Sequence, residues 1–216
     1  MSATYIALLG DAIGSRALPP RRRARLQRDL RAALPVFNRR WRATLAARFG
    51  VTLGDEFQCL LTSAAPVWEI AHTVRAAWPD IEWAIACGRG AVTTLTPGIT
   101  APEADGPCFH AARAAMDDAK RRRLLFAFRG FGEDAILNAL ASYYSALYWS
   151  WTPRQRHAAK LLRSGDPAAT ARRLGVHPSA VSHLRRRLAW PLVAAGDTMF
   201  QTLLHGPAPK SRARAP

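Results

Sequence analysis

Long apolar runs are missing from this sequence of 216 residues. No stretch of 18 or more uncharged apolar residues occurs, so we expect no membrane-spanning helix and no membrane partner. The chain also opens on a strand-like segment, Tyr5–Leu9, without the basic and apolar regions of a signal peptide. Both absences predict a soluble, cytoplasmic protein.

Cysteine is also scarce. Cys59, Cys87 and Cys108 are far apart, and each lies in an apolar context. This spacing excludes a disulfide framework and a CxxC metal site, so we expect three small residues of the core. The hydrophobic share of 49% is large enough for the core of one ordinary domain and a small second one.

Acidic residues are few, and they are almost missing from the C-terminal end. The sequence holds 31 Lys and Arg against 15 Asp and Glu, a formal net charge of +16. Residues 152–216 hold 12 of the basic residues but only two acidic ones, Asp166 and Asp197. Only three of the 31 are Lys, which an arginine-favouring codon usage explains, but such usage does not explain the uneven placement. In a protein without membrane segments this asymmetry indicates a polyanionic partner, most simply nucleic acid.

Three short helices with tight breaks are predicted for residues 152–204. Thr152 is a typical N-cap of the first helix, and Asp166 is a typical N-cap of the second. Gly175 would end the second helix and open a turn of three or four residues before the third, which starts at Pro178. A glycine-containing turn of this length between two helices indicates a helix-turn-helix.

The third predicted helix carries side chains suited to reading DNA. Ala171 is small enough for the third helix to cross the second, and Val181 and Leu184 would pin it. Short polar groups can approach base edges, and the arginines that follow can reach phosphates. A helical bundle with a solvated arginine face is one alternative, and a helix-turn-helix that binds only protein is another. The predicted partner is double-stranded DNA, contacted by Ser179, Ser182, His183, Arg185, Arg186 and Arg187.

Residues 1–132 are predicted to form strands and helices in the order β-α-β-β-α-β-α-β. The first helix is expected to run from Pro19 to Ala47, with Pro35 kinking or splitting it. This order predicts a sheet with helices packed on one face. The expected strands are 5–9, 51–53, 57–61, 81–94 and 123–128, and the other expected helices are 66–78 and 107–120.

An acidic turn is the most informative feature of this N-terminal part. Asp55 and Glu56 stand beside Gly54, between two apolar segments that predict the strands of a β-hairpin. Asp11 follows Gly10 at the end of the first strand, where a carboxylate would face a crevice. A rigid turn can hold carboxylates still, as a hard divalent cation requires. The alternative is an ordinary Gly-Asp turn on the surface.

The element order, with Asp11 and Asp55 in these places, resembles the catalytic domain that class III nucleotide cyclases share with GGDEF diguanylate cyclases. The segment LGDEF at residues 53–57 is similar to the GGDEF signature, and residues 85–90 and 106–113 are similar to a cyclase strand and helix motif. The chain from Tyr5 to about Leu204 resembles the bacterial SatD family, whose members look like fusions of this domain with a C-terminal helix-turn-helix. The resemblance implies an α+β fold: a ferredoxin-like, cyclase-like palm domain followed by an all-α helix-turn-helix domain.

The resemblance also implies ligands. Cyclases use two carboxylates to hold two metal ions on a nucleoside triphosphate, so Mg²⁺ and a nucleotide are the implied cofactors. The implied metal ligands are Asp11, Asp55 and Glu56, the implied nucleotide-binding residues are Gly10, Gly54 and Arg113, and Asp11, Asp55 and Arg113 would be catalytic in an active enzyme.

Three departures from the cyclase pattern favour binding without turnover. Phe109 takes the place of an Asn that helps to hold the substrate, and Val51 takes the place of a basic side chain on the strand before the turn. Leu53 replaces the first Gly of GGDEF, where a side chain would crowd the approach of a nucleotide.

We therefore expect a DNA-binding regulatory protein whose N-terminal domain senses a nucleotide with a divalent metal. The alternatives are a metal-dependent nucleotide cyclase or nucleotidyl transferase that the helix-turn-helix targets to DNA, and a protein-binding adaptor. The palm domain would span residues 1–132, a linking helix 133–151, the helix-turn-helix 152–204 and a disordered basic tail 205–216. The apolar stripe of the linking helix would be either core or the seam of a homodimer.

Overall fold

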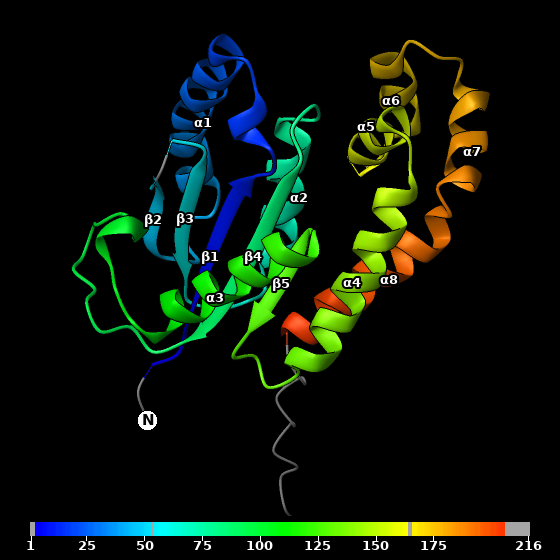
Figure 1. Ribbon diagram of the computed structural model, residues 1–216. Helices are drawn as coiled ribbons and strands as arrows, with labels where there is room; N and C mark the ends of the chain where they lie inside the picture. The colour runs from blue at the N-terminus through cyan, green and yellow to red at the C-terminus, as the bar shows by residue number, and fades with distance from the viewer. Residues whose placement is uncertain (1–2, 53, 164–165, 206–216) are drawn as a thin grey trace, which may run out of the picture.

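The computed structural model describes residues 3–52, 54–163 and 166–205. Within these ranges the protein is a mixed α and β structure with one five-stranded sheet and eight α-helices (Figure 1). The strands are β1 (Tyr5–Ala12), β2 (Leu45–Val51), β3 (Glu56–Leu61), β4 (Trp83–Gly90) and β5 (Phe126–Arg129). The helices are α1 (Pro20–Arg40), α2 (Val67–Ala77), α3 (Pro107–Arg122), α4 (Asp134–Ser150), α5 (Pro153–Leu162), α6 (Pro167–Leu174), α7 (Pro178–Arg187) and α8 (Trp190–His205). The predicted order of elements before α4 is confirmed.

The sheet has the strand order β2-β3-β1-β4-β5, with β1 at its centre. All neighbours are antiparallel except β4 and β5, which are parallel. Leu8 on β1 lies opposite Cys59 on β3 and opposite Cys87 on β4, so both cysteines are inside the sheet. All three cysteines are buried free thiols, as expected.

Helices cover both faces of the sheet, so the prediction that they pack on one face is wrong. Ile6 and Leu8 contribute to a core shared with α1 and α2, whereas Ala7 and Leu9 contribute to a second core beneath α3. The reason is in the strands themselves. β1 is apolar at successive positions rather than at alternate ones, and a strand of this kind has to be covered on both sides.

The first helix is shorter than predicted. α1 ends at Arg40, and Leu45–Val51 forms the edge strand β2 instead of a last helical turn. Asn38 accounts for the change, because its side-chain oxygen accepts from the Phe49 backbone N–H at 2.7 Å and its amide donates to the Phe49 carbonyl. α1 continues through Pro35 without being split. The first hairpin strand therefore lies before the predicted 51–53, and Leu53 is outside the described residues.

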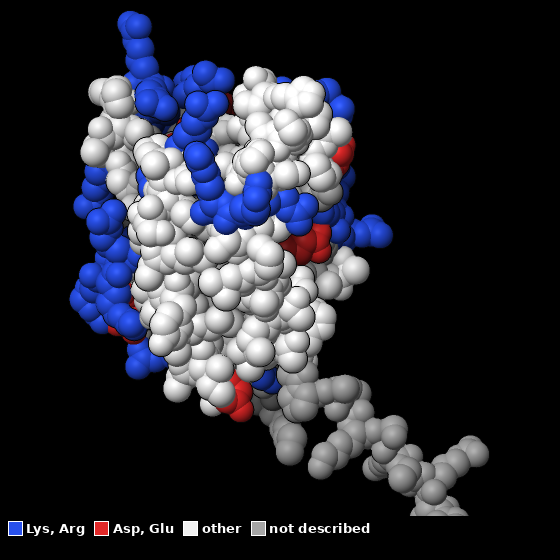
Figure 2. Space-filling model, turned by 90° about the vertical axis from the view of Figure 1, so that its right-hand side faces the viewer, with Lys and Arg blue, Asp and Glu red and all other residues white. Residues whose placement is uncertain are grey.

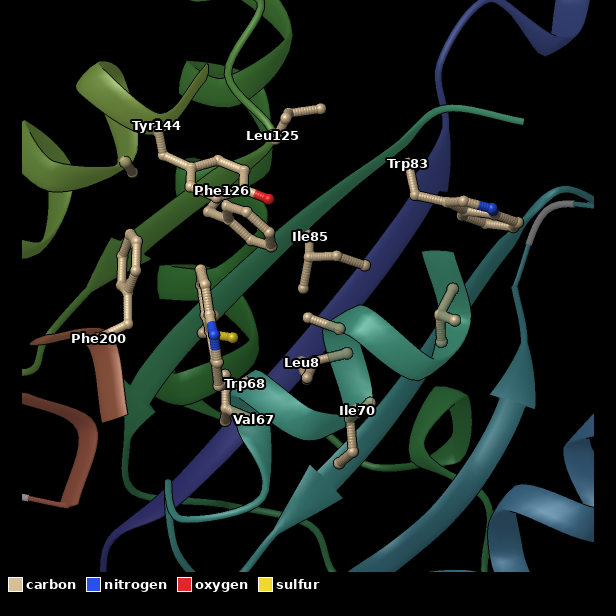
Figure 3. Close-up of a cluster of buried hydrophobic side chains, with 14 of the residues drawn as sticks. Leu8, Val67, Trp68, Ile70, Trp83, Ile85, Leu125, Phe126, Tyr144 and Phe200 are labelled. Carbon is tan, nitrogen blue, oxygen red and sulfur yellow. The ribbon is translucent and has the colours of Figure 1, made fainter. Parts of the chain in front are cut away.

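The C-terminal helices pack on the sheet through an aromatic cluster. Phe200 of α8 stacks on Trp68 of α2 with ring centroids 4.0 Å apart. Helix α8 itself was not predicted from the sequence. Phe126 of β5 and Tyr144 of α4 complete the cluster (Figure 3). One continuous core thus runs from β1 to α8.

A buried ionic cluster adds a polar connection between these parts. Lys160 of α5 is 3% exposed and donates to the carbonyl oxygens of Pro79 and Ile81 at 2.8 and 2.9 Å. Its ammonium lies 3.0 Å from the Glu82 carboxylate, which also accepts from Tyr148. Burial lowers the pKa of Lys160 to about 8, and the Glu82 carboxylate opposes this shift.

The helices of the described residues are too short or too polar to cross a bilayer.

Gly88 sets the distance between α3 and the sheet. A Cβ at Gly88 would lie 2.2 Å from the Ala112 nitrogen and 2.2 Å from the Cys108 carbonyl oxygen, both backbone atoms of α3. Gly196 is the matched control, because nothing lies within 4 Å of a Cβ built there.

We expect Gly88→Ala to lower the free energy of unfolding by about 3 kcal/mol, because backbone atoms cannot move aside as a side chain can. Gly196→Ala should instead raise it by up to about 1 kcal/mol through helix propensity. Urea unfolding of both variants tests this. A Gly88→Ala variant as stable as the wild type would contradict the close approach of α3.

Candidate functional site

The acidic corner lies where β1 ends and β3 begins. The strand register places Asp11 directly opposite Glu56, and both residues lie on the face that α3 covers. Asp55 precedes Glu56 in the turn, and its carbonyl oxygen accepts from the Ala12 backbone N–H at 3.4 Å. A cleft of about 350 Å³ opens here. Asp11, Asp55 and Glu56 line it together with Arg16, Lys120 and Arg123.

Glu56 is committed to holding Arg113. The Arg113 guanidinium donates two hydrogen bonds to the Glu56 carboxylate, at 2.7 and 2.8 Å. The Thr52 hydroxyl donates a third at 2.7 Å, and the Gln58 amide donates a fourth at 3.3 Å. Burial tends to raise the pKa of Glu56, but the hydrogen bonds from Arg113 and Thr52 outweigh it and hold the pKa below its ordinary value. Glu56 is therefore an ionised positioning group with few lone pairs left for a metal.

Asp11 pairs with a lysine that sequence reasoning missed. The Lys120 ammonium of α3 lies 3.1 Å from the Asp11 carboxylate. Burial raises the pKa of Asp11; Lys120 opposes the shift, and the Glu56 and Asp55 carboxylates reinforce it. Lys120 follows Arg113 by seven residues, two helical turns, so the two cations share a face of α3. That spacing was the available signal.

Asp55 has a partner of its own in Ser15. The Ser15 hydroxyl donates a hydrogen bond to the Asp55 carboxylate from the short 3-10 helix Ser15–Ala17. No local motif in the sequence connects these two residues, which are 40 positions apart. All three carboxylates of the corner thus have protein partners.

Local packing and backbone conformation explain why glycine occupies two positions of the predicted site, Gly54 and Gly10. Gly54 has a φ of +55°, and a Cβ there would lie 2.6 Å from the Gln27 side-chain nitrogen, so the turn requires glycine. A Cβ at Gly10 would lie 2.2 Å from the Phe57 ring, on the sheet face opposite the cleft. Neither glycine lines the cleft, and Arg113 does not line it either, although it contacts the lining residue Glu56.

Two residues that depart from the cyclase pattern, Phe109 and Val51, do not line the cleft. Phe109 is 9% exposed and packs in the core beneath α3, and Val51 packs partly buried against the opposite core at the end of β2. Leu53, the third departure, lies outside the described residues.

The carboxylates of the cleft suit a metal ion that is already bound to the phosphates of a ligand. Among the described residues no group of three or more His, Cys, Asp and Glu side chains is arranged to hold a metal ion. Of the three carboxylates that line the cleft, Glu56 is held by Arg113, which leaves Asp11 and Asp55 as candidate metal ligands. Mg²⁺ is commonly held by one or two carboxylates together with substrate phosphates, so the pair fits a metal–phosphate complex better than a bare ion.

The second set of predicted residues lies on α7. Thr152 and Asp166 cap α5 and α6 as expected, by accepting from the N–H groups of Gln155 and Ala168. Gly175 has a φ of +61°, and Ala171 and Val181 are buried where α6 and α7 meet. All six residues predicted to contact DNA are exposed: Ser179, Ser182, His183, Arg185, Arg186 and Arg187.

Basic side chains gather on the side of the molecule where α7 lies. Figure 2 shows them as a belt across the upper part of that side, above a broad uncharged area. His183 and Arg186 lie close together, with the His183 Nδ1 2.7 Å from the Arg186 guanidinium.

A model of one protein family, described as the SatD family, matches residues 5–162 of the chain. The matched segment runs from β1 to the end of α5, so it includes the acidic corner and leaves α6, α7 and α8 outside. No curated protein and no solved structure matches the chain.

The lowered pKa of Glu56 predicts acid sensitivity. Because the folded pKa lies below the ordinary 4.5, the pair with Arg113 contributes stability at neutral pH that is lost as pH falls through the folded pKa. Glu56→Gln should therefore lose less free energy of unfolding than the wild type between about pH 6 and about pH 3. Urea unfolding at each pH measures this. Glu133→Gln, at an exposed position, should follow the wild type; equal slopes for all three proteins would contradict the ion pair.

Proposed function

The chain belongs to the SatD family, and we propose that it is a DNA-binding regulatory protein whose cyclase-like α+β domain senses a nucleotide with a divalent metal. The observation that carries the DNA-binding part is the geometry of α6 and α7. They are joined through Gly175 in the left-handed conformation, and they present six exposed polar and basic side chains on one short helix.

In this proposal α5, α6 and α7 are the helix-turn-helix and α7 is the reading helix. Ser179 and Ser182 stand near its N-terminal end, where short polar groups come closest to base edges in the major groove. Arg185, Arg186 and Arg187 occupy its last turn, where they would contact phosphates of double-stranded DNA. Residues 1–132 would form the sensing unit and α4 the link to the reading head.

The arginines of α7 give a measurable test. We expect Arg185→Ala combined with Arg187→Ala to weaken binding to a duplex selected from a random pool. The slope of log affinity against log salt should fall by about two phosphate contacts. Titration at several salt concentrations, followed by fluorescence anisotropy, measures both.

The matched control removes the same charge elsewhere. Arg21→Ala combined with Arg22→Ala changes two exposed arginines at the start of α1 and should leave the slope of the wild type. Equal losses in the two double variants would show that total charge, rather than α7, accounts for binding.

The sensing part of the proposal rests on the acidic corner. A metal ion bound to nucleotide phosphates would take the Asp11 and Asp55 oxygens, and Lys120 would exchange its contact with Asp11 for a phosphate. Arg16 and Arg123 also line the cleft and add positive charge for a polyanionic ligand. Phe109 and Val51 stand in the places of polar groups of active cyclases, and both pack in the cores, so these positions supply no polar group to a substrate; this favours binding over turnover.

We expect a nucleoside triphosphate with Mg²⁺ to bind, and Mg²⁺ alone to bind far more weakly, because the corner supplies only two carboxylates that Arg113 does not hold, Asp11 and Asp55. Titration calorimetry with ATP and with GTP measures this. Asp11→Asn and Asp55→Asn should abolish binding, whereas Asp29→Asn, at an exposed carboxylate of α1, should not. Binding unchanged in all three variants would remove the corner from the proposal.

The same arrangement supports a second function. Two carboxylates beside Lys120 in one cleft are the minimum that metal-assisted phosphoryl chemistry needs, so the protein could be a nucleotide cyclase or nucleotidyl transferase. Chromatography of the nucleotides after incubation with Mg²⁺ or Mn²⁺ separates the two functions. A new product that disappears in Asp55→Asn would establish the enzyme.

A further inference from the structure

Two long helices of this strongly basic protein carry no lysine or arginine. α4 and α8 contain one acidic residue each, Asp134 and Asp197. The Asp134 carboxylate accepts from the backbone N–H groups of Gly130 and Phe131, at 2.7 and 2.8 Å. Asp197 accepts from the Trp68 indole at 3.2 Å and pairs with Arg163. Both carboxylates are therefore hydrogen-bonded within the protein.

Large apolar side chains stand out from these two helices into solvent. Ile136 and Tyr143 of α4 are 51% and 78% exposed, and Leu192 and Met199 of α8 are 63% and 50% exposed. In each helix the two residues are seven positions apart, so they share one face. Exposed alanines, Ala139 on α4 and Ala195 on α8, lie between them. Val36 of α1 is the other large apolar side chain of comparable exposure among the described residues.

We name these residues together, Ile136, Ala139, Tyr143, Leu192, Ala195 and Met199, the α4–α8 face. The two helices pack against each other. Figure 2, drawn from the side on which α4, α7 and α8 lie, shows a broad area without charge below the basic belt. Exposed large apolar side chains that are grouped on two packed helices, rather than scattered singly, mark an interaction site, so the α4–α8 face is a candidate docking surface.

The charge of the protein selects that occupant. DNA is unsuitable because its phosphates require lysine and arginine. An acidic protein would be drawn to the basic surfaces elsewhere on the molecule. A second copy of a chain with net charge +16 is repelled by most of the first, and it can approach closely where both copies are uncharged. The α4–α8 face meets this condition for both partners at once.

We propose that the α4–α8 face is the interface of a homodimer with twofold symmetry. In such an interface the same residues face each other across the axis, and depletion of charge with exposed aromatic and Met side chains is typical of its core. The small side chains of Ala139 and Ala195 allow α4 and α8 of one copy to approach those of the other copy closely. The inference goes beyond the proposed function because it does not require DNA or nucleotide binding.

The dimer would fix the separation of the two α7 helices. α7 leads into α8 through Leu188 and Ala189, and Ala189 has a φ of +49°, so the corner is tight. The Val193 N–H donates to the Ala189 carbonyl at 3.2 Å, which continues the start of α8. Pairing of the two copies through α4 and α8 would therefore set the distance between their α7 helices, because only the tight corner at Ala189 separates each α7 from its α8.

Molar mass in solution tests the interface. Light scattering after size exclusion should give twice the mass of one chain for the wild type, and half that value for Tyr143→Glu and for Leu192→Glu. Both positions are exposed, so circular dichroism and the melting temperature of the monomeric variants should show an intact fold. Val36→Glu adds the same charge at an apolar position outside the face that is 52% exposed, and it should remain a dimer.

Salt provides an independent readout. Raising the ionic strength screens the repulsion between two basic chains, so dimerisation should strengthen with salt, whereas DNA binding weakens. A wild type that has the mass of one chain at every concentration, or a Tyr143→Glu variant that stays dimeric, would overturn the proposal. A dimer that binds no DNA would refute the proposed function and leave this interface standing.

Discussion

The close contact between α3 and β4 is the constraint on which the acidic corner depends. Because Gly88 has no side chain, the α3 backbone rests directly against the sheet. That approach places Arg113 beside Glu56 and Lys120 beside Asp11. The carboxylates come from two strands and the cations from one helix, so the corner exists only where all three elements meet. Its chemistry is therefore a property of the packing between layers rather than of the turn alone.

The second organising feature is that the sheet and the C-terminal helices share one core. The stack of Trp68 on Phe200 and the contacts of Lys160 with the segment before β4 join them by an apolar and a polar route. Helices α5 to α8 are therefore packed against the rest of the protein and are not joined to it by the chain alone. The packed side chains between the segment before β4 and α5 are a physical connection through which the two parts of the protein are in contact.

Local signals in the sequence predicted the elements well, and long-range contacts account for what they missed. Thr152, Asp166 and Gly175 predicted the caps and the turn of α5 to α7, because a cap involves neighbours within a few residues. The end of α1 was wrong because Asn38 bonds to Phe49, a contact that helical periodicity does not reveal. In the corner, Asp11, Asp55 and Glu56 were predicted to come together and do so, but Ser15 and Lys120 were missed because they reach the site from other elements. The covering of both sheet faces could have been predicted from the successive apolar residues of β1.

The three thiols have a consequence of another kind. Burial raises the pKa of Cys59 and of Cys87, which flank Leu8 at the centre of the sheet, and it raises the pKa of Cys108, on the buried side of α3, to about 11. A thiol reacts as its thiolate and only when a reagent can reach it, so oxidation or alkylation of the native protein has to wait until the strands separate. The sheet thus shields the cysteine sulfur atoms from oxidants. The rate at which these thiols are modified therefore reports how often the native structure opens.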